Sequence, residues 1–179
     1  MVKPGTKMTK KASVATRPFQ GIRIEVDTSV AFDEVLSRLR QLMGKASVSE
    51  IVALAKEEIT EDEFVQEVEE RFIGESGFML FYEIDHGGLL RRFGINRRAV
   101  RWLLGNPLIA VTMIRHDITA GLFAPVEMLV TEKDGGLGAT ITYVRPSSLI
   151  VIEENPRLSE AAKVLDEKLD ALIASATGA

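Results

Sequence analysis

Residues 126–144 read VEMLVTEKDGGLGATITYV, with two apolar runs on either side of Asp134-Gly135-Gly136. The runs are rich in β-branched residues, which are typical of strands. The Asp-Gly-Gly sequence is typical of tight turns, because glycine readily adopts positive φ. This stretch therefore predicts an antiparallel hairpin, with strands 126–131 and 139–144 joined by residues 134–136.

Three segments that precede this hairpin also have strand character. Residues 19–27 alternate apolar and polar side chains, which is the period of a strand with one buried face. Residues 78–85 and 99–104 are apolar runs of strand length. Strands that follow one another through short links favour antiparallel pairing, so we expect one antiparallel sheet of about five strands.

Helices are predicted where apolar residues recur at helical spacing behind a capping residue. The first covers 32–43, with Thr28 or Ser29 as its cap and Gly44 at its end. A long final helix begins at Asn155-Pro156, where proline in the first helical position costs no hydrogen bond. Its apolar stripe consists of Leu158, Ala162, Leu165, Leu169 and Leu172.

A short apolar helix, residues 108–114, is predicted after the turn Gly105-Asn106-Pro107. Residues 86–96 are interpreted as a glycine-containing, arginine-rich connection, and Pro146 is expected to close the last strand. All neighbouring strands are then linked by short segments or helices. The helices are expected to pack on one face of the sheet.

Two capping boxes predict two further helices, one from Ser47 with Glu50 and one from Thr60 with Glu63. They lie in a strongly acidic stretch, residues 50–75, which we interpret as a solvated helical face. The start of the chain instead carries cations and no acid. These cations are Lys3, Lys7, Lys10, Lys11 and Arg17.

The predicted fold is α+β, with elements in the order β-α-(α-α)-β-β-α-β-β-α. We expect a disordered basic arm at 1–17 and a single domain at 18–179, with an acidic helical insertion at about 47–75. The length of 179 residues is within the usual range of one domain.

The composition excludes several classes of function. The chain has no cysteine, which excludes disulfides, thiolate metal sites and a cysteine nucleophile and fits the reducing cytoplasm. A net charge of −4 makes nucleic acid an unexpected partner. No apolar run is long enough to span a bilayer, so we expect no membrane partner.

Several short motifs occur together and in a fixed order. They are Ile84-Asp85-His86, Gly105-Asn106-Pro107, Asp117, Ala124-Pro125, and Tyr143 with Pro146. With them, residues 78–149 resemble a family of uncharacterised prokaryotic proteins known as domain of unknown function 302, and residues 19–43 also fit the opening of that family. The resemblance implies a strand-helix-four-strand-helix fold with a curved antiparallel sheet and association into homo-oligomers. It implies no activity, since the family is named for the lack of one.

An anion site is one candidate for chemistry. The helix start after Asn106 offers exposed N–H groups, and guanidinium groups that pair well with carboxylate or phosphate precede it. The candidate ligand-binding residues are Asn106, Arg97, Arg98 and Arg101. Alternation places Arg101 on the strand side of Ala99 and Leu103. The alternative interpretation is a plain helix cap, with surface arginines that pair with the protein's own acids.

The two histidines are the other candidate, because each adjoins an aspartate: Asp85-His86 and His116-Asp117. Carboxylate and imidazole are the ligands left to a cysteine-free chain, so the four residues could form a metal site or an acid–base pair. Their spacing is not that of a helical zinc motif, and no metal ligand set is assigned. A turn or a cap explains each pair equally well.

The leading hypothesis from the sequence is therefore a homo-oligomeric binding protein for a small anionic ligand, expected to be a homodimer because an exposed sheet edge invites pairing. The alternatives are a metal-dependent or acid–base enzyme that uses the two Asp-His pairs, and a purely structural interaction module. Whether the domain catalyses a reaction, and with which cofactor, is left open by the sequence.

Overall fold

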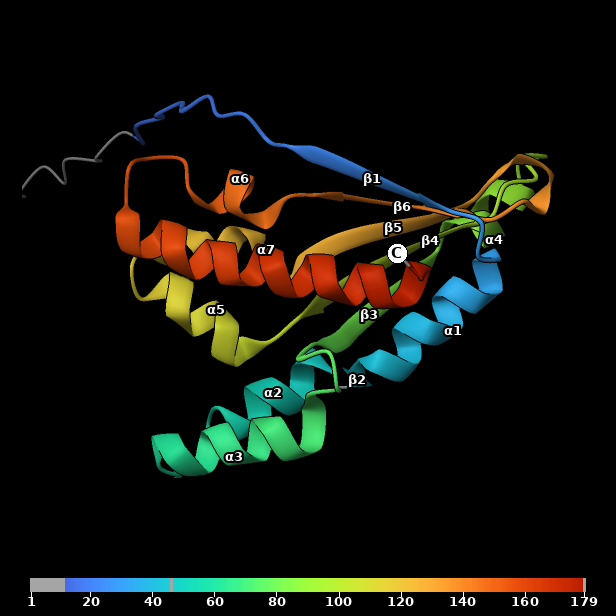
Figure 1. Ribbon diagram of the computed structural model, residues 1–179. Helices are drawn as coiled ribbons and strands as arrows, with labels where there is room; N and C mark the ends of the chain where they lie inside the picture. The colour runs from blue at the N-terminus through green and yellow to red at the C-terminus, as the bar shows by residue number, and fades with distance from the viewer. Residues whose placement is uncertain (1–11, 46, 179) are drawn as a thin grey trace, which may run out of the picture.

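The computed structural model describes residues 12–45 and 47–178. Within these residues six strands form one sheet, in the order β1-β6-β5-β4-β3-β2 (Figure 1). Neighbouring strands are antiparallel, apart from the parallel pair of β2 and β3. The strands are β1 (Arg23–Thr28), β2 (Gly44–Lys45), β3 (Met79–Asp85), β4 (Ala99–Gly105), β5 (Val126–Glu132) and β6 (Ala139–Val144).

Helices connect these strands and close the chain. They are α1 (Phe32–Leu42), α2 (Val48–Leu54), α3 (Glu61–Phe72), α4 (His86–Arg91), α5 (Pro107–Ile114), α6 (Pro146–Ile150) and α7 (Pro156–Thr177), with 3-10 turns η1 (Ile118–Phe123) and η2 (Asp134–Gly136). The α+β class is confirmed. The prediction of about five antiparallel strands is corrected, because the sheet includes β2 and is mixed.

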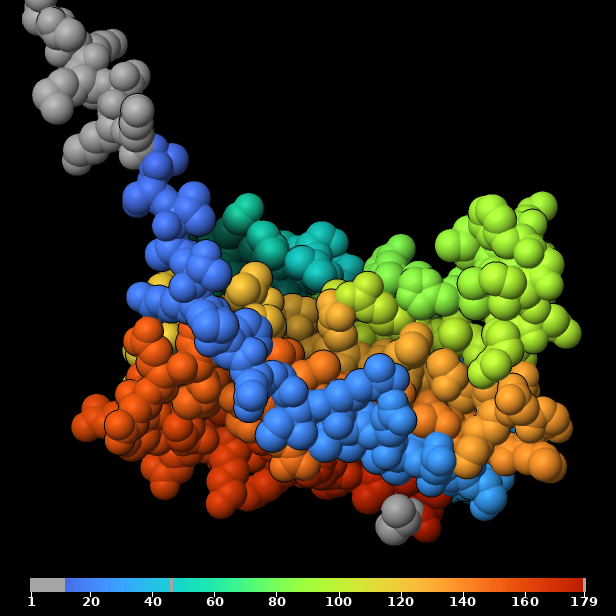
Figure 2. Space-filling model, turned by 90° about the horizontal axis from the view of Figure 1, so that it is seen from above, coloured from blue at the N-terminus to red at the C-terminus, as the bar shows by residue number. Residues whose placement is uncertain are grey.

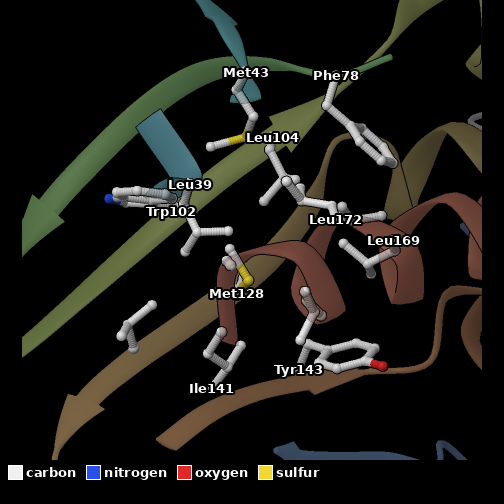
Figure 3. Packing of buried hydrophobic residues seen from close by; sticks show 14 of the residues in the cluster. Leu39, Met43, Phe78, Trp102, Leu104, Met128, Ile141, Tyr143, Leu169 and Leu172 are labelled. Atoms are coloured by element: carbon white, nitrogen blue, oxygen red, sulfur yellow. The ribbon is translucent and has the colours of Figure 1, made fainter. Parts of the chain in front are cut away.

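The main core lies between the sheet and the helices α1, α5 and α7 (Figure 1). Alternate residues of β4 point into it, and Trp102 at its centre is fully buried. Figure 3 shows Trp102, Met128 and Ile141 of three adjacent strands facing Leu169 and Leu172 of α7. Every residue of the predicted α7 stripe is buried, so that prediction is confirmed. The long helix is thus held by a continuous apolar face.

The predicted hairpin is also confirmed. Strands β5 and β6 pair antiparallel from Met128 opposite Tyr143 to Glu132 opposite Ala139. The turn between them contains Gly135 and Gly136, both with φ above +70°. A conformation of this kind is strained for any residue with a side chain, which explains the two glycines.

Two helix boundaries differ from the prediction. Helix α1 begins after Ala31 without a side-chain cap. The Thr28 hydroxyl instead accepts from the Val30 N–H and donates to the carbonyl of Thr177, so it ties the start of α1 to the end of α7. The helix ends at Leu42, and Gly44 belongs to β2 rather than to a terminating turn.

Two short helices replace predicted connections. Residues 86–91 form α4, because the Asp85 carboxylate accepts from the Gly88 N–H and caps the first turn. Pro146 occupies the first position of α6, two residues beyond the end of β6. Both helices are single turns or little more, too short for a hydrophobic period to show in the sequence.

The acidic insertion forms a helical pair, α2 and α3, and both predicted capping boxes are present. The hydrogen bonds of these boxes hold the pKa of Glu50 and of Glu63 below its usual value. A small second core of Leu54, Val68, Phe72 and Met79 attaches the pair to the sheet. Of the predicted basic arm, residues 1–11 lie outside the described part of the chain.

The other face of the sheet is not covered by a helix of the described residues. Figure 2 looks onto this face, with residues 12–22 along one end and the segment around α4 at the other. The strand registers align Ile84, Arg101, Leu129 and Thr142 across it in one row. An antiparallel sheet usually places polar residues on its solvated face, so the apolar residues in this row are notable.

Candidate functional site

A cleft of about 680 Å³ lies on the uncovered face of the sheet, which we call the sheet-face cleft. Side chains of β4, β5 and β6 form its floor, and η1 and α6 border it. The lining side chains include Arg23, His86, Arg101, Leu122, Phe123, Pro125, Glu127, Leu129, Thr142, Val144 and Leu149. The volume falls in the range of small-molecule sites, which combine apolar walls with a few polar groups.

The charged groups that line this cleft are two arginines and one glutamate. Arg101 on β4 and Glu127 on β5 form an ion pair across the two strands. The hydrogen bond between the two side chains raises the pKa of Arg101. At the edge of the sheet, Arg23 pairs with Glu25 at 2.6 Å. His86 adds an imidazole from the start of α4.

The apolar wall of the cleft is built by η1 and α6. The rings of Phe19 and Phe123 meet edge to face, with centroids 6.1 Å apart. Beside them, Leu122 is 78% exposed although it borders the cleft. An exposed leucine next to a ligand-sized hollow favours a site that an apolar group completes.

Asn106 lies elsewhere, at the start of α5. Its carbonyl oxygen accepts from the Leu108 N–H at 2.8 Å, which confirms the predicted cap. Its amide donates to the carbonyl of Gly77 at 2.9 Å, so both ends of the side chain have protein partners. A small pocket of about 170 Å³ beside it is lined almost entirely by apolar groups.

The predicted arginines do not converge on Asn106. Arg97 pairs with Asp134 at 3.2 Å. Arg98 pairs with Asp33 and Glu132 and stacks over the Phe32 ring. The alternation of β4 is as expected, but the side of Arg101 is the one that faces away from the helices. The three arginines therefore form separate ion pairs with other acids in place of the cluster expected around Asn106.

The two Asp-His pairs also lie apart. Asp85 caps α4, whereas Asp117 caps η1 by accepting from the N–H and hydroxyl of Thr119. These hydrogen bonds lower the pKa of Asp117. His86 lines the sheet-face cleft and His116 lines a second cleft on the helical side. Among the described residues, no three His, Asp or Glu side chains are grouped as metal ligands.

The second cleft, which we call the helical cleft, has a volume of about 580 Å³ and lies among α3, α5 and α7. It brings the predicted candidates Asn106 and His116 together with Arg115. It also contains Arg157 and Lys168 of α7, which the sequence analysis did not single out. A cation in the first turn of a helix, where the helix dipole disfavours it, is the signal that could have identified Arg157. Lys168 lies in the middle of α7 and carries no such signal.

These features define an α+β domain with one face of its sheet covered by helices and ligand-sized clefts on both sides. The chain belongs to the family described as "Domain of unknown function DUF302", whose model matches residues 52–176. A crystal structure of an uncharacterised conserved DUF302 protein from Bacillus stearothermophilus has a TM-score of 0.59 with this chain at 19% identity. The match covers 87% of this chain and 98% of that one, and at this identity it shows the fold alone.

A search of curated proteins found no match. Among the described residues, no helix is both long and apolar enough to cross a membrane.

Proposed function

We propose that this protein is a binding domain for a small amphipathic anion, held in the sheet-face cleft. The observation that carries this proposal is Arg101, a cation on the floor of a mostly apolar hollow. Because no helix of the described residues covers this face of the sheet, its apolar side chains are exposed to water, which is unfavourable. A ligand with an apolar body would cover them.

The two parts of the ligand would contact different walls. An apolar body fits against Leu129, Val144 and Phe123, which line the cleft from β5, β6 and η1. An acidic group would approach Arg101, whose guanidinium has five N–H donors and can serve Glu127 and a second acid together. Arg23 lies along the same cleft and adds positive charge, and His86 adds an imidazole.

A pair of fluorescent probes tests this function. We expect the anion 8-anilinonaphthalene-1-sulfonate to bind the folded protein more tightly than neutral N-phenyl-1-naphthylamine, which has the same ring system. Arg101→Gln should weaken the binding of the sulfonate by roughly tenfold, as expected for the loss of one charge-assisted contact. The affinity for the neutral probe should stay unchanged. Arg97→Gln is the matched control, because Arg97 is an exposed, paired arginine outside the cleft. Equal losses in the two variants would contradict the proposal.

We further propose that the domain works as a homodimer joined through β1. Strand β1 lies at the end of the sheet, and one of its two edges has no strand partner among the described residues. If two copies of β1 paired antiparallel about Glu25, Arg23 would lie opposite Asp27 of the second copy, and Ile24 opposite Val26. On one face two Arg23–Asp27 pairs would then flank the point where the two Glu25 side chains meet, and on the other face the apolar Ile24 and Val26 would lie opposite one another.

A further inference from the structure

The helical cleft differs from the sheet-face cleft in its chemistry. Its cationic groups are Arg115, which follows α5, and Arg157 and Lys168, which lie on α7. His116, which also follows α5, adds an imidazole. Among the described residues, no carboxylate lies within 4 Å of Arg115, Arg157 or Lys168. Most arginines elsewhere in the described residues, such as Arg98, have such partners, and Arg92 is the exception.

Three of these groups are held at one end of the cleft. The Asn155 amide donates to the carbonyl of His116 at 3.4 Å, while its carbonyl oxygen caps α7 by accepting from the Leu158 N–H. One side chain therefore joins the end of α5 to the start of α7. Arg115, His116 and Arg157 are brought to this junction by the backbone and not by attraction to an acid.

The position of Arg157 is unfavourable for the free protein. It lies in the first turn of α7, which has no acidic residue to balance the positive end of the helix dipole. A bound anion would relieve both the dipole and the mutual repulsion of Arg115 and Arg157. Glu160 and Glu69 at the cleft do not pair with these arginines within 4 Å.

The rest of the cleft is suited to the remainder of a small molecule. Ile109, Ala161 and Val164 give it an apolar middle. Lys168 lies at the other end, about 16 Å along α7 from Arg157, since a helix rises about 1.5 Å per residue. Its ammonium group lies beside Gly77, to which the Asn106 amide donates.

We propose that the helical cleft binds a small molecule through a phosphate or diphosphate group, placed between Arg115, His116 and Arg157. Two guanidinium groups offer more positive charge and more donors than one carboxylate can use, whereas a diphosphate matches them. The apolar middle of the cleft then receives the body of the ligand. This site is independent of the amphipathic anion site on the sheet face.

Inorganic pyrophosphate is the probe, titrated into the full chain by isothermal calorimetry at constant ionic strength. Arg157→Gln and Arg115→Gln should each weaken binding by about fivefold or more, as expected for the loss of a charge-assisted contact. Lys163→Gln is the matched control, because it removes a cation from the exposed surface of the same helix outside the cleft. It should change the affinity by less than about twofold.

Three results would overturn the proposal. The first is no binding of pyrophosphate at up to ~10 mM, an affinity too weak for a specific site. The second is an equal loss of pyrophosphate affinity in Arg115→Gln, Arg157→Gln and Lys163→Gln, which would show that the anion responds only to the net charge of the protein. The third is binding of malonate, a dicarboxylate, as tight as that of pyrophosphate. Thermal melting of each variant separates a lost contact from a lost fold, and Arg101→Gln should leave pyrophosphate binding unchanged.

Discussion

Arg101 and Glu127 form an ion pair across β4 and β5, on the face of the sheet that no helix of the described residues covers. The pair lies on the floor of a mostly apolar cleft, and both side chains are partly exposed. Glu127 therefore has two effects on a ligand there. It holds the guanidinium in place, and it competes with any acid that approaches.

These effects lead to a prediction for Glu127→Gln. The glutamine has the size of the glutamate but no charge, so it should release Arg101 from its ion pair. We therefore expect 8-anilinonaphthalene-1-sulfonate to bind several-fold more tightly. The neutral naphthylamine probe should be unaffected. Glu132→Gln, which disturbs the ion pair of Arg98 outside the cleft, serves as the control. A weaker sulfonate complex in Glu127→Gln would mean that the carboxylate mainly positions the arginine.

A second prediction concerns Trp102, which is fully buried and whose indole N–H has no partner among the described residues. Trp102→Phe loses no hydrogen bond, so its cost in free energy of unfolding should be about 1–2 kcal/mol. Trp102→Ala leaves a cavity and should cost ~3–5 kcal/mol. Urea unfolding followed by circular dichroism measures both. Equal costs would indicate that the indole N–H has a partner after all.

The sequence could predict those elements whose own residues show a clear turn motif or a long apolar period. The Asp134-Gly135-Gly136 turn needs positive φ, and the α7 stripe follows a helical period over many turns. Strand β2 has two residues and no period, and it is a strand only through its parallel pairing with β3, at a place where the absence of a side chain on Gly44 leaves room for the backbone of Phe72. Helix α4 was hidden by Gly87 and Gly88, which are poor helix formers.

The candidate sites were harder to predict, because they depend on which face of the sheet the helices cover. Alternation in β4 correctly grouped Arg101 with Leu103, but both faces of the strand carry leucine. Local pattern therefore did not decide which face was buried. The helical cleft requires α5 and α7 to lie side by side, a contact that the spacing of Arg115 and Arg157 in the chain does not reveal.

A third prediction concerns alkaline pH. Burial, and a hydrogen bond that its hydroxyl donates to the Asp170 carboxylate, raise the pKa of Tyr143 above its usual value. A group with a raised pKa in the folded state contributes stability below its unfolded pKa of about 10, and this contribution is lost as pH rises further. Tyr143→Phe should cost ~1 kcal/mol at pH 8 and show a smaller loss of stability between pH 9 and 11. Parallel pH curves for the two proteins would refute this assignment.

A fourth prediction concerns the contact of Gly44 with α3. A Cβ atom added at Gly44 would lie 1.8 Å from the carbonyl oxygen of Phe72, which is backbone and cannot turn aside. Gly44→Ala should therefore detach the α2–α3 pair or destabilise the protein by more than ~3 kcal/mol. Gly121→Ala is the control, because its Cβ would meet Ile114 at an ordinary 3.6 Å. Melting temperature and limited proteolysis between residues 46 and 76 measure the two effects.

The last prediction concerns the proposed homodimer. Light scattering at micromolar concentration should give twice the mass of a single chain. Arg23→Asp would set acids opposite one another where two β1 strands meet, so we expect a shift to monomer. Adding Asp27→Arg to that variant exchanges the two charges and should restore the dimer. Arg92→Asp makes the same charge change at the end of α4, away from β1, and should have no effect. A monomeric wild-type protein would rule out the dimer, and failure of the double variant to re-form it would rule out pairing in this register.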